Sequence, residues 1–309
     1  MARRVNGTPS DPRPLFALAI RLGAIAALAT MSALIKLAGQ HGIHLLEIMF
    51  WRQAVAALIM LCWVVPRGDL RSLATQRPGT HFLRALYGTI GMLFNFGAVI
   101  LLPLAEATTM AFTAPIWAVI LSTLLLKEKV GAWRWSAVLF GFAGVLLIAQ
   151  PGSGTFPLFG AGVALAGAFM VALISIQIAD LNRTDKPFTI VFFFAMFSLP
   201  MTAVALPFVM TRHDAAGWVL LFAIGAFGVL GQLLLTAALR FGAVASVIVM
   251  DYSSLFWATL YGWLLFASLP PGSTWLGTPL IIAAGLVIAW REHRLSRPTL
   301  RDVSRAEGA

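Results

Sequence analysis

The chain has 309 residues, of which 60% are hydrophobic and only 11% are charged, and its formal net charge is +10. A soluble domain carries about a quarter of charged residues, so this composition, with a mean hydropathy of +0.88, excludes an ordinary water-soluble protein. The single cysteine, Cys62, excludes a disulfide framework and a cysteine-based metal site.

Apolar runs of about 20 residues recur along the chain, and each is long enough for a helix that crosses the hydrocarbon core of a bilayer. Short breaks rich in glycine, proline or charge separate these runs. The sequence therefore predicts an all-α integral membrane protein with ten transmembrane helices. They are predicted near residues 15–38, 44–65, 82–102, 104–126, 132–150, 157–180, 187–209, 215–239, 243–267 and 273–291.

Lys and Arg fall almost entirely on one side of the predicted membrane. Of the 22, 18 lie in the two tails and in alternate connections, Arg212 lies on the other side, and Arg21, Lys36 and Arg52 lie within spans. Cytoplasmic loops accumulate these residues. The tails, 1–14 and 292–309, are therefore predicted to be cytoplasmic in a multi-pass protein of a bacterial-type inner membrane. Orientation explains the positive charge, which leaves no patch for nucleic acid.

The two halves of the chain resemble each other. Residues 91–149 and 231–289 share 14 identities in 59 positions without a gap, including the pair Trp117 and Trp257. Five helices per half is an odd number, so the second half enters the membrane from the opposite side. Residues 15–150 and 157–291 are therefore predicted to be inverted-topology five-helix repeats, an architecture of secondary transporters.

Three stretches resemble the EamA-type drug/metabolite transporter (DMT) superfamily. They are "GAVILLPLAEATTMAFTAPIWAVILSTLLLKEKVGAWRWSAVLFGFAGVLLIAQPG" from Gly97 to Gly152, "LGTPLIIAAGLVIAWRE" in the second half, and "EIMFWRQAVAALIML" in the second span. The resemblance implies ten helices, both termini inside and no ATPase domain. It also implies export of amino acids or other metabolites, although some relatives take up riboflavin or S-adenosylmethionine.

Asp251 is a lone carboxylate in a long apolar run, and an ionisable side chain inside a membrane span is a functional candidate by default. Asp251 and Gln232 are equidistant from the turn between the eighth and ninth spans, so both should lie roughly 12 Å inside the core. Tyr252 and Ser253 follow directly. We expect Asp251 either to bind a cationic group of a substrate or to carry a coupling proton. The alternative is a structural tie to Gln232.

Charged side chains in the first two spans need partners as well. Lys36 and Glu47 fall at matching depth near the outer end, where an ion pair would offset the desolvation of both charges. A substrate contact is the alternative. Arg52 lies ~8 Å deeper and needs Glu47, backbone carbonyls or an anionic group of the substrate. Arg21 is expected to extend to the cytoplasmic interface.

Further side chains are candidates for lining a substrate path. Asn95 lies in the third span, close to the depth of several threonines in the fourth. Trp117, Trp257 and Tyr261 are candidate aromatic walls, with helix packing as the alternative. Pro115 in the middle of the fourth span is expected to interrupt its hydrogen bonding.

No motif predicts an enzyme, a cofactor or a metal site. The five histidines lie at span ends or in loops, and neither H-E-x-x-H nor G-x-x-x-x-G-K-[ST] is present. We therefore expect a carrier that moves a small organic metabolite, amino-acid-like or otherwise zwitterionic or cationic, by alternating access. Efflux is expected, uptake of a larger metabolite is the alternative, and a channel or scaffold is a more distant one. The expected partners are the solute and the lipid bilayer, and a homodimer is left open.

Overall fold

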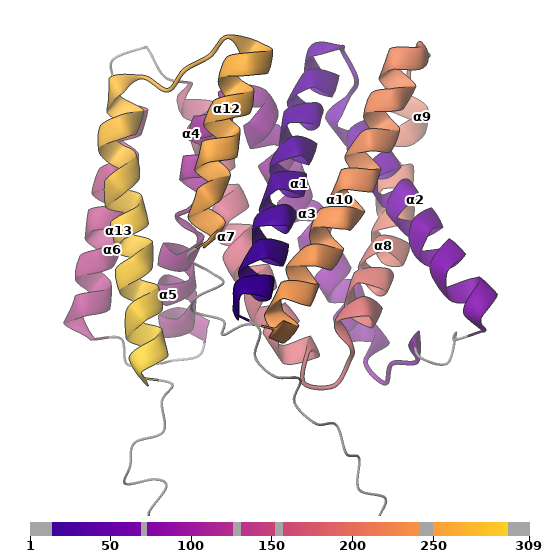
Figure 1. Ribbon diagram of the computed structural model, residues 1–309, viewed down its shortest axis with the longest axis horizontal. Helices are drawn as coiled ribbons and strands as arrows, with labels where there is room; N and C mark the ends of the chain where they lie inside the picture. Colours follow the sequence, from indigo (N-terminus) through magenta and orange to yellow (C-terminus); the bar gives the residue numbers. More distant parts are fainter. Residues whose placement is uncertain (1–13, 69–72, 126–130, 152–156, 242–249, 296–309) are drawn as a thin grey trace, which may run out of the picture.

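The computed structural model describes residues 14–68, 73–125, 131–151, 157–241 and 250–295, and these residues form helices and no strand (Figure 1). The first half contains α1 (Pro14–Gln40), α2 (Leu45–Val64), η1 (Val65–Arg67), α3 (Pro78–Leu101), α4 (Leu104–Ala111), α5 (Ala114–Leu125) and α6 (Ala132–Ala149). The second half contains α7 (Leu158–Leu181), α8 (Pro187–Ala203), α9 (Leu206–Val209), α10 (Ala215–Phe241), η3 (Met250–Ser253), α12 (Ser254–Phe266) and α13 (Gly272–Leu295).

Eight helical segments of the described chain are long and apolar enough to cross a membrane, and one of them combines α4 with α5. The all-helical prediction is therefore confirmed for the described residues. The predicted seventh span, 187–209, is shorter than expected, because α8 ends at Ala203, just after Pro200. The predicted ninth span begins in residues 242–249, which lie outside the described residues, so the count of ten stays a prediction.

The outer surface of the bundle is apolar, as a lipid environment requires. Large side chains such as Leu139 and Phe208 expose 71% and 87% of their surface. Apolar patches of this extent are rare on soluble proteins and indicate contact with a membrane or a partner. The surface therefore agrees with the composition in placing the bundle in a bilayer.

The fourth predicted span is interrupted between α4 and α5, beside Pro115. A proline has no N–H, so it cannot complete a helical hydrogen bond to the carbonyl four residues earlier. The backbone tightens there, with Thr113 N donating to Met110 O at 3.1 Å and the Thr113 hydroxyl donating to the same oxygen at 2.7 Å. The interruption predicted at this proline is present.

Three helix pairs dominate the packing of the bundle: α1 with α10, α3 with α7, and α6 with α13 (Figure 1). At the α6–α13 crossing two described glycines bring the backbones of the helices into close contact. A Cβ on Gly277 would lie 2.5 Å from the carbonyl oxygen of Gly144, so only glycine permits this approach. Close backbone contact of this kind stabilises helix pairs in membranes, where apolar burial gives little. Figure 1 also shows that α1 begins and α13 ends at the same end of the bundle.

Candidate functional site

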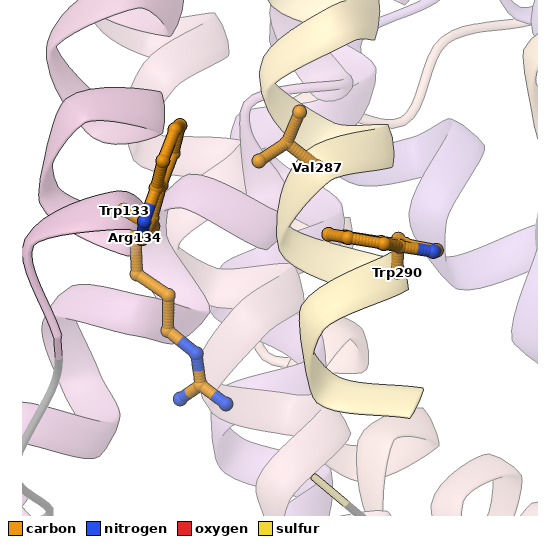
Figure 2. A pocket seen from close by; sticks show the side chains of 4 residues that line it. All are labelled: Trp133, Arg134, Val287 and Trp290. Atoms are coloured by element: carbon orange, nitrogen blue, oxygen red, sulfur yellow. The ribbon is translucent and has the colours of Figure 1, made fainter. Parts of the chain in front are cut away.

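A surface groove of about 410 Å³ lies between the start of α6 and the end of α13 (Figure 2). Trp133, Arg134, Val287 and Trp290 line it, and both tryptophans are more than half exposed. Tryptophan and arginine at helix ends are typical of the membrane–water interface. The groove therefore belongs to the lipid-facing surface, and the polar chemistry of the chain lies elsewhere.

Asp251 is bound by Arg21. The Nε of Arg21 donates to Oδ1 at 2.7 Å and its Nη2 donates to Oδ2 at 2.6 Å, so the ion pair is bidentate. The Arg21 side chain is 8% exposed, whereas that of Asp251 is 41% exposed and reaches solvent-accessible space. The sequence predicts that Arg21 extends to the cytoplasmic interface, and this prediction is wrong. The side chain turns inward instead, because η3, which carries Asp251, packs against α1.

The neighbours of Asp251 have separate roles. Gln232 lies half-buried on α10 and has an interaction partner of its own. The ring of Tyr252 packs edge-on against Phe112 of α4, with centroids 4.9 Å apart. The Ser253 hydroxyl is buried and has no hydrogen-bond partner among the described residues. The structure therefore shows Asp251 tied to the first half of the chain by Arg21.

Lys36 and Glu47 do not form the predicted ion pair. The ammonium of Lys36 donates to the carbonyl oxygens of Val99 and Leu102 at 3.1 and 2.7 Å. These carbonyls belong to the end of α3, where a helix leaves its last acceptors without partners. Glu47 is fully buried and its Oε1 lies 2.5 Å from Nε2 of His213. Matching depth in neighbouring spans does not predict these partners, because each lies far away in the sequence.

Arg52 takes part in a chain of polar contacts that crosses to α8. Its Nη1 donates to Oε1 of Gln53 at 2.5 Å and contacts Sδ of Met92 at 3.2 Å. Gln53 in turn donates from Nε2 to the hydroxyl of Ser198 at 2.6 Å. Neither Glu47 nor a backbone carbonyl is its partner in the described residues, so two of the three partners expected for Arg52 are excluded there.

Two buried charged residues were not predicted as site residues. Glu106 on α4 is 2% exposed; its Oε1 lies 3.5 Å from the hydroxyl of Thr274, and its Oε2 has no described partner. Arg84 on α3 is 7% exposed, although the count of charges groups it with the cytoplasmic connection that precedes the predicted span 82–102. Its position seven residues into the helix, within the apolar pattern, is the signal that could have found it.

The predicted aromatic walls and Asn95 make packing contacts. Trp117 meets Phe142 and Phe169 edge-on, at 5.4 and 5.6 Å between centroids. Trp257 stacks on Tyr261 at 6.1 Å, and the Tyr261 hydroxyl lies 2.8 Å from that of Thr30. Asn95 donates to the carbonyl of Gly91 at 2.7 Å and weakly to that of Gly167. A role of these residues in binding stays a prediction.

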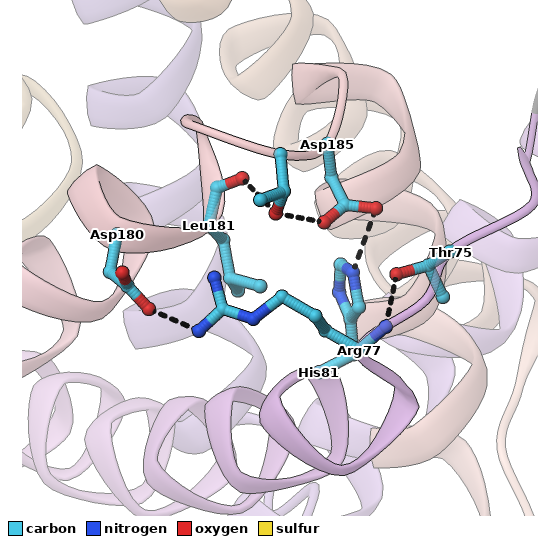
Figure 3. Close-up of polar contacts among 7 residues, drawn as sticks. Thr75, Arg77, His81, Asp180, Leu181 and Asp185 are labelled. Atoms are coloured by element: carbon cyan, nitrogen blue, oxygen red, sulfur yellow. Dashed lines mark hydrogen bonds and ion pairs between the residues drawn. The ribbon is translucent and has the colours of Figure 1, made fainter.

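A polar cluster joins the start of α3 to the α7–α8 connection (Figure 3). Arg77 donates to Asp180 at 2.5 Å, and Nε2 of His81 lies 3.6 Å from Oδ1 of Asp185. Burial alone would raise the pKa of Asp185, but hydrogen bonds from Thr184 and Thr75 together with the nearby His81 hold that pKa below its ordinary value.

Comparison with known proteins decides the family. The sequence profile of the EamA-like transporter family matches the chain twice, over residues 15–150 and 158–290. The chain belongs to the EamA-like transporter family.

Relatives of this EamA-like transporter include proteins with different named solutes. It is 30% identical to the riboflavin transporter of Vibrio cholerae over 84% of its length and 87% of the relative. It is 28% identical to the pseudopaline exporter of Pseudomonas aeruginosa, over 84% and 91% of the two chains. It is 26% identical to the S-adenosylmethionine uptake transporter of Rickettsia bellii, over 82% and 86%.

A solved structure described as "Crystal structure of protein" shares the fold of this EamA-like transporter. The TM-score is 0.61 at 19% identity, over 92% of this chain and all of the other. The resemblance of the sequence to this family is thus confirmed, and so is its assignment as a multi-pass membrane protein that transports a small metabolite.

Proposed function

We propose that this EamA-like transporter is a secondary carrier that works by alternating access in the bacterial inner membrane. Ten crossings in two inverted five-helix repeats, 15–150 and 157–291, would place both termini in the cytoplasm. The family profile supports the repeat because it matches each segment separately. The apolar outer surface and the common end of the bundle for α1 and α13 support the topology.

The helix packing also supports an inverted repeat. The offset of 140 residues relates α3 to α10, α5 to α12 and α6 to α13. In the structure α3 and α5 both pack against α7, whereas α10 and α12 both pack against α1. The related helices α6 and α13 pack against each other. The two halves thus exchange contacts as two copies around a pseudo-twofold axis would.

One observation carries the proposed mechanism: every close contact of a carboxylate with an arginine or histidine among the described residues joins the first family-matched segment to the second. They are Arg21–Asp251, Arg77–Asp180, His81–Asp185 and Glu47–His213.

These pairs lie at two different ends of the bundle. Arg77 precedes α3 and Arg21 lies in the second turn of α1, at the end where the chain enters the bundle. Glu47 lies in the first turn of α2, beyond the far end of α1. We infer that the pairs are latches of two gates. Separation of the halves at one end would break one set while the other set keeps the opposite side closed.

The solute is proposed to be a small organic metabolite and the direction to be export. The carboxylate of Asp251 supports a cationic or zwitterionic solute. Any cationic group that binds this carboxylate has to displace Arg21, which holds it in a strong bidentate ion pair. Uptake is the second candidate function, and the relatives named for riboflavin and S-adenosylmethionine favour it.

Counterflow in liposomes tests the carrier. The purified protein is reconstituted with riboflavin, S-adenosylmethionine or a mixture of amino acids inside, and entry of the labelled solute is measured. A carrier shows saturable entry that the internal solute accelerates. Non-saturable, pore-like conductance would exclude the proposed mechanism. A metabolite comparison of cells that lack or overproduce the protein then assigns direction, because export raises the solute outside.

A further inference from the structure

Two guanidinium groups in the membrane-spanning part of the first segment have no carboxylate partner among the described residues. Arg84 is 7% exposed, and its Nε and Nη1 have no hydrogen-bond partner among the described residues. The Nε of Arg52 is buried and without a described partner as well. Both lie at α3, because Arg52 contacts the sulfur of Met92, about two turns after Arg84 on the same helix. Such an arrangement is unfavourable in a membrane interior and calls for an anion.

The described carboxylates within the bundle are engaged elsewhere. Their contacts are Asp251 with Arg21, Glu47 with His213, Asp180 with Arg77, Asp185 with Thr184 and His81, Glu106 with Thr274, and Asp214 with the backbone N–H of Gly217. The described part of the chain therefore supplies no counter-charge to Arg52 or Arg84.

A continuous set of contacts holds the two arginines in place. Gln53 accepts from Arg52 and donates to Ser198, whose hydroxyl donates to the carbonyl of Phe194. The ring of Phe194 lies 4.2 Å from Cζ of Arg84. The site is therefore built from α2, α8 and α3, which are packed against one another.

Glycine leaves the space that this arrangement needs. A Cβ on Gly88 would overlap both Arg84 and Phe194, so the stack forms only beside a glycine. A Cβ on Gly228 of α10 would lie 3.3 Å from Nε of Arg52, which is close contact. The space around both guanidinium groups therefore depends on glycine at positions 88 and 228.

The stack on Phe194 uses the face of the Arg84 guanidinium and leaves its in-plane N–H donors unused. Such a fork, with no acid beside it among the described residues, suits a carboxylate or a phosphate, and Arg52 adds a second positive charge with an unpartnered Nε. Met92 and Phe96 beside Arg52 provide apolar surface for the organic part of a ligand. Arg52 is mostly buried but keeps part of its surface exposed, and a ligand can approach it from that part.

We propose that Arg52 and Arg84 together bind the oxyanion group, carboxylate or phosphate, of the transported solute. The inference rests on the proposed function because it takes the bound ligand to be the solute that the protein transports. It adds a substrate class that Asp251 does not indicate: the solute carries a negative charge. A zwitterion would satisfy both sites, with its cationic group competing with Arg21 for Asp251.

Binding to the purified full-length protein in phosphatidylcholine nanodiscs tests the site. The probes are phenyl phosphate and benzoate, with benzylamine as the cationic control, at constant ionic strength because salt screens such contacts. At least one anionic probe should raise the unfolding temperature by ~3 °C or more, and benzylamine should not. Arg52→Met and Arg84→Met should each weaken probe binding by about tenfold or more.

Two further variants separate a ligand site from a structural role. Arg84→Met should raise the unfolding temperature without any probe, because it removes an uncompensated buried charge. Arg84→Lys keeps the charge but loses the planar fork, so it should fold and still bind more weakly. Arg67→Met removes an exposed cation that stacks on Trp63, and it should keep the full response.

Several outcomes would overturn the proposal. One is that no anionic probe raises the unfolding temperature of the wild-type protein more than benzylamine does, and another is that the Met variants show the same rise. A third is that added phosphatidylglycerol alone abolishes the rise, which would assign the oxyanion to lipid. The proposed function fails separately. Intact probe binding without counterflow of any solute contradicts the carrier, whereas wild-type counterflow by the Arg52→Met, Arg84→Met double variant contradicts only this inference.

Discussion

Arg21 on α1 and Asp251 at the start of η3 form a bidentate ion pair between the two family-matched segments, although 230 residues separate them. The pair replaces the interfacial arginine and the free acid that the linear sequence suggests. A substitution of Asp251 therefore also changes the contact between the two halves.

Asp251→Asn should destabilise the protein and impair transport. The substitution leaves the nearly buried Arg21 without its counter-charge, at a cost of about 1–3 kcal/mol, between the values for buried and exposed pairs because Asp251 is 41% exposed. Thermal unfolding of the purified protein measures the loss, and counterflow measures the transport. The double variant Arg21→Asn, Asp251→Asn should regain part of the stability. A single variant with wild-type stability and transport would contradict the latch.

Lys36 and Glu47 should show no energetic coupling. Lys36→Met leaves carbonyls at the end of α3 without a donor and should cost about 1–3 kcal/mol. Glu47→Gln disrupts a separate contact with His213. The double variant should therefore equal the sum of the two within about 0.5 kcal/mol in a double-mutant cycle. A larger coupling energy would instead support the ion pair between Lys36 and Glu47 that their matching depth predicts.

Asp185 should make stability depend on acid pH. Its pKa in the folded protein lies below the ordinary value, so the unfolded chain binds its proton first as the pH falls. Its contribution is complete above the unfolded-state pKa of about 3.9 and is lost progressively as the pH falls from there through the folded pKa. Unfolding temperatures of the wild type and Asp185→Asn should converge in this acid range. Curves that stay parallel there would exclude the effect.

Gly277→Ala should loosen the α6–α13 crossing. The new Cβ would lie 2.5 Å from the Gly144 carbonyl oxygen, and the overpacking should cost about 1–3 kcal/mol. Gly162→Ala on α7 is the matched control, because no atom lies within 4 Å of its new Cβ. Equal unfolding temperatures of the two variants would show that the crossing tolerates separation.

Local regularity made much of the fold predictable. A membrane helix satisfies its own backbone within a run of about 20 apolar residues, so length and composition locate most spans. The interruption beside Pro115 follows from one missing N–H and was predictable for the same reason. The shortening of α8 was not predicted, although Pro200 and Pro207 lie in the expected span.

The candidate site was less predictable. The sequence identifies charges that need partners in Asp251, Lys36 and Arg52. It does not identify the partners, because comparing the depth of residues in consecutive spans considers only neighbouring helices. Arg84 was counted with the cytoplasmic charges because it lies only two residues inside the predicted span 82–102. Glu106 is not among the predicted site residues, because it lies near the start of the predicted span 104–126 and resembles a boundary residue.

The sequence by itself determined that this protein is a helical membrane protein of the EamA type, because apolar length, charge asymmetry and family motifs are local properties of the chain. Only the tertiary structure decided which groups neutralise the buried charges. Arg21 meets Asp251 and Glu47 meets His213 across 230 and 166 residues. Electrostatic pairing falls off over a few ångströms, so helix packing selects each partner and sequence distance does not.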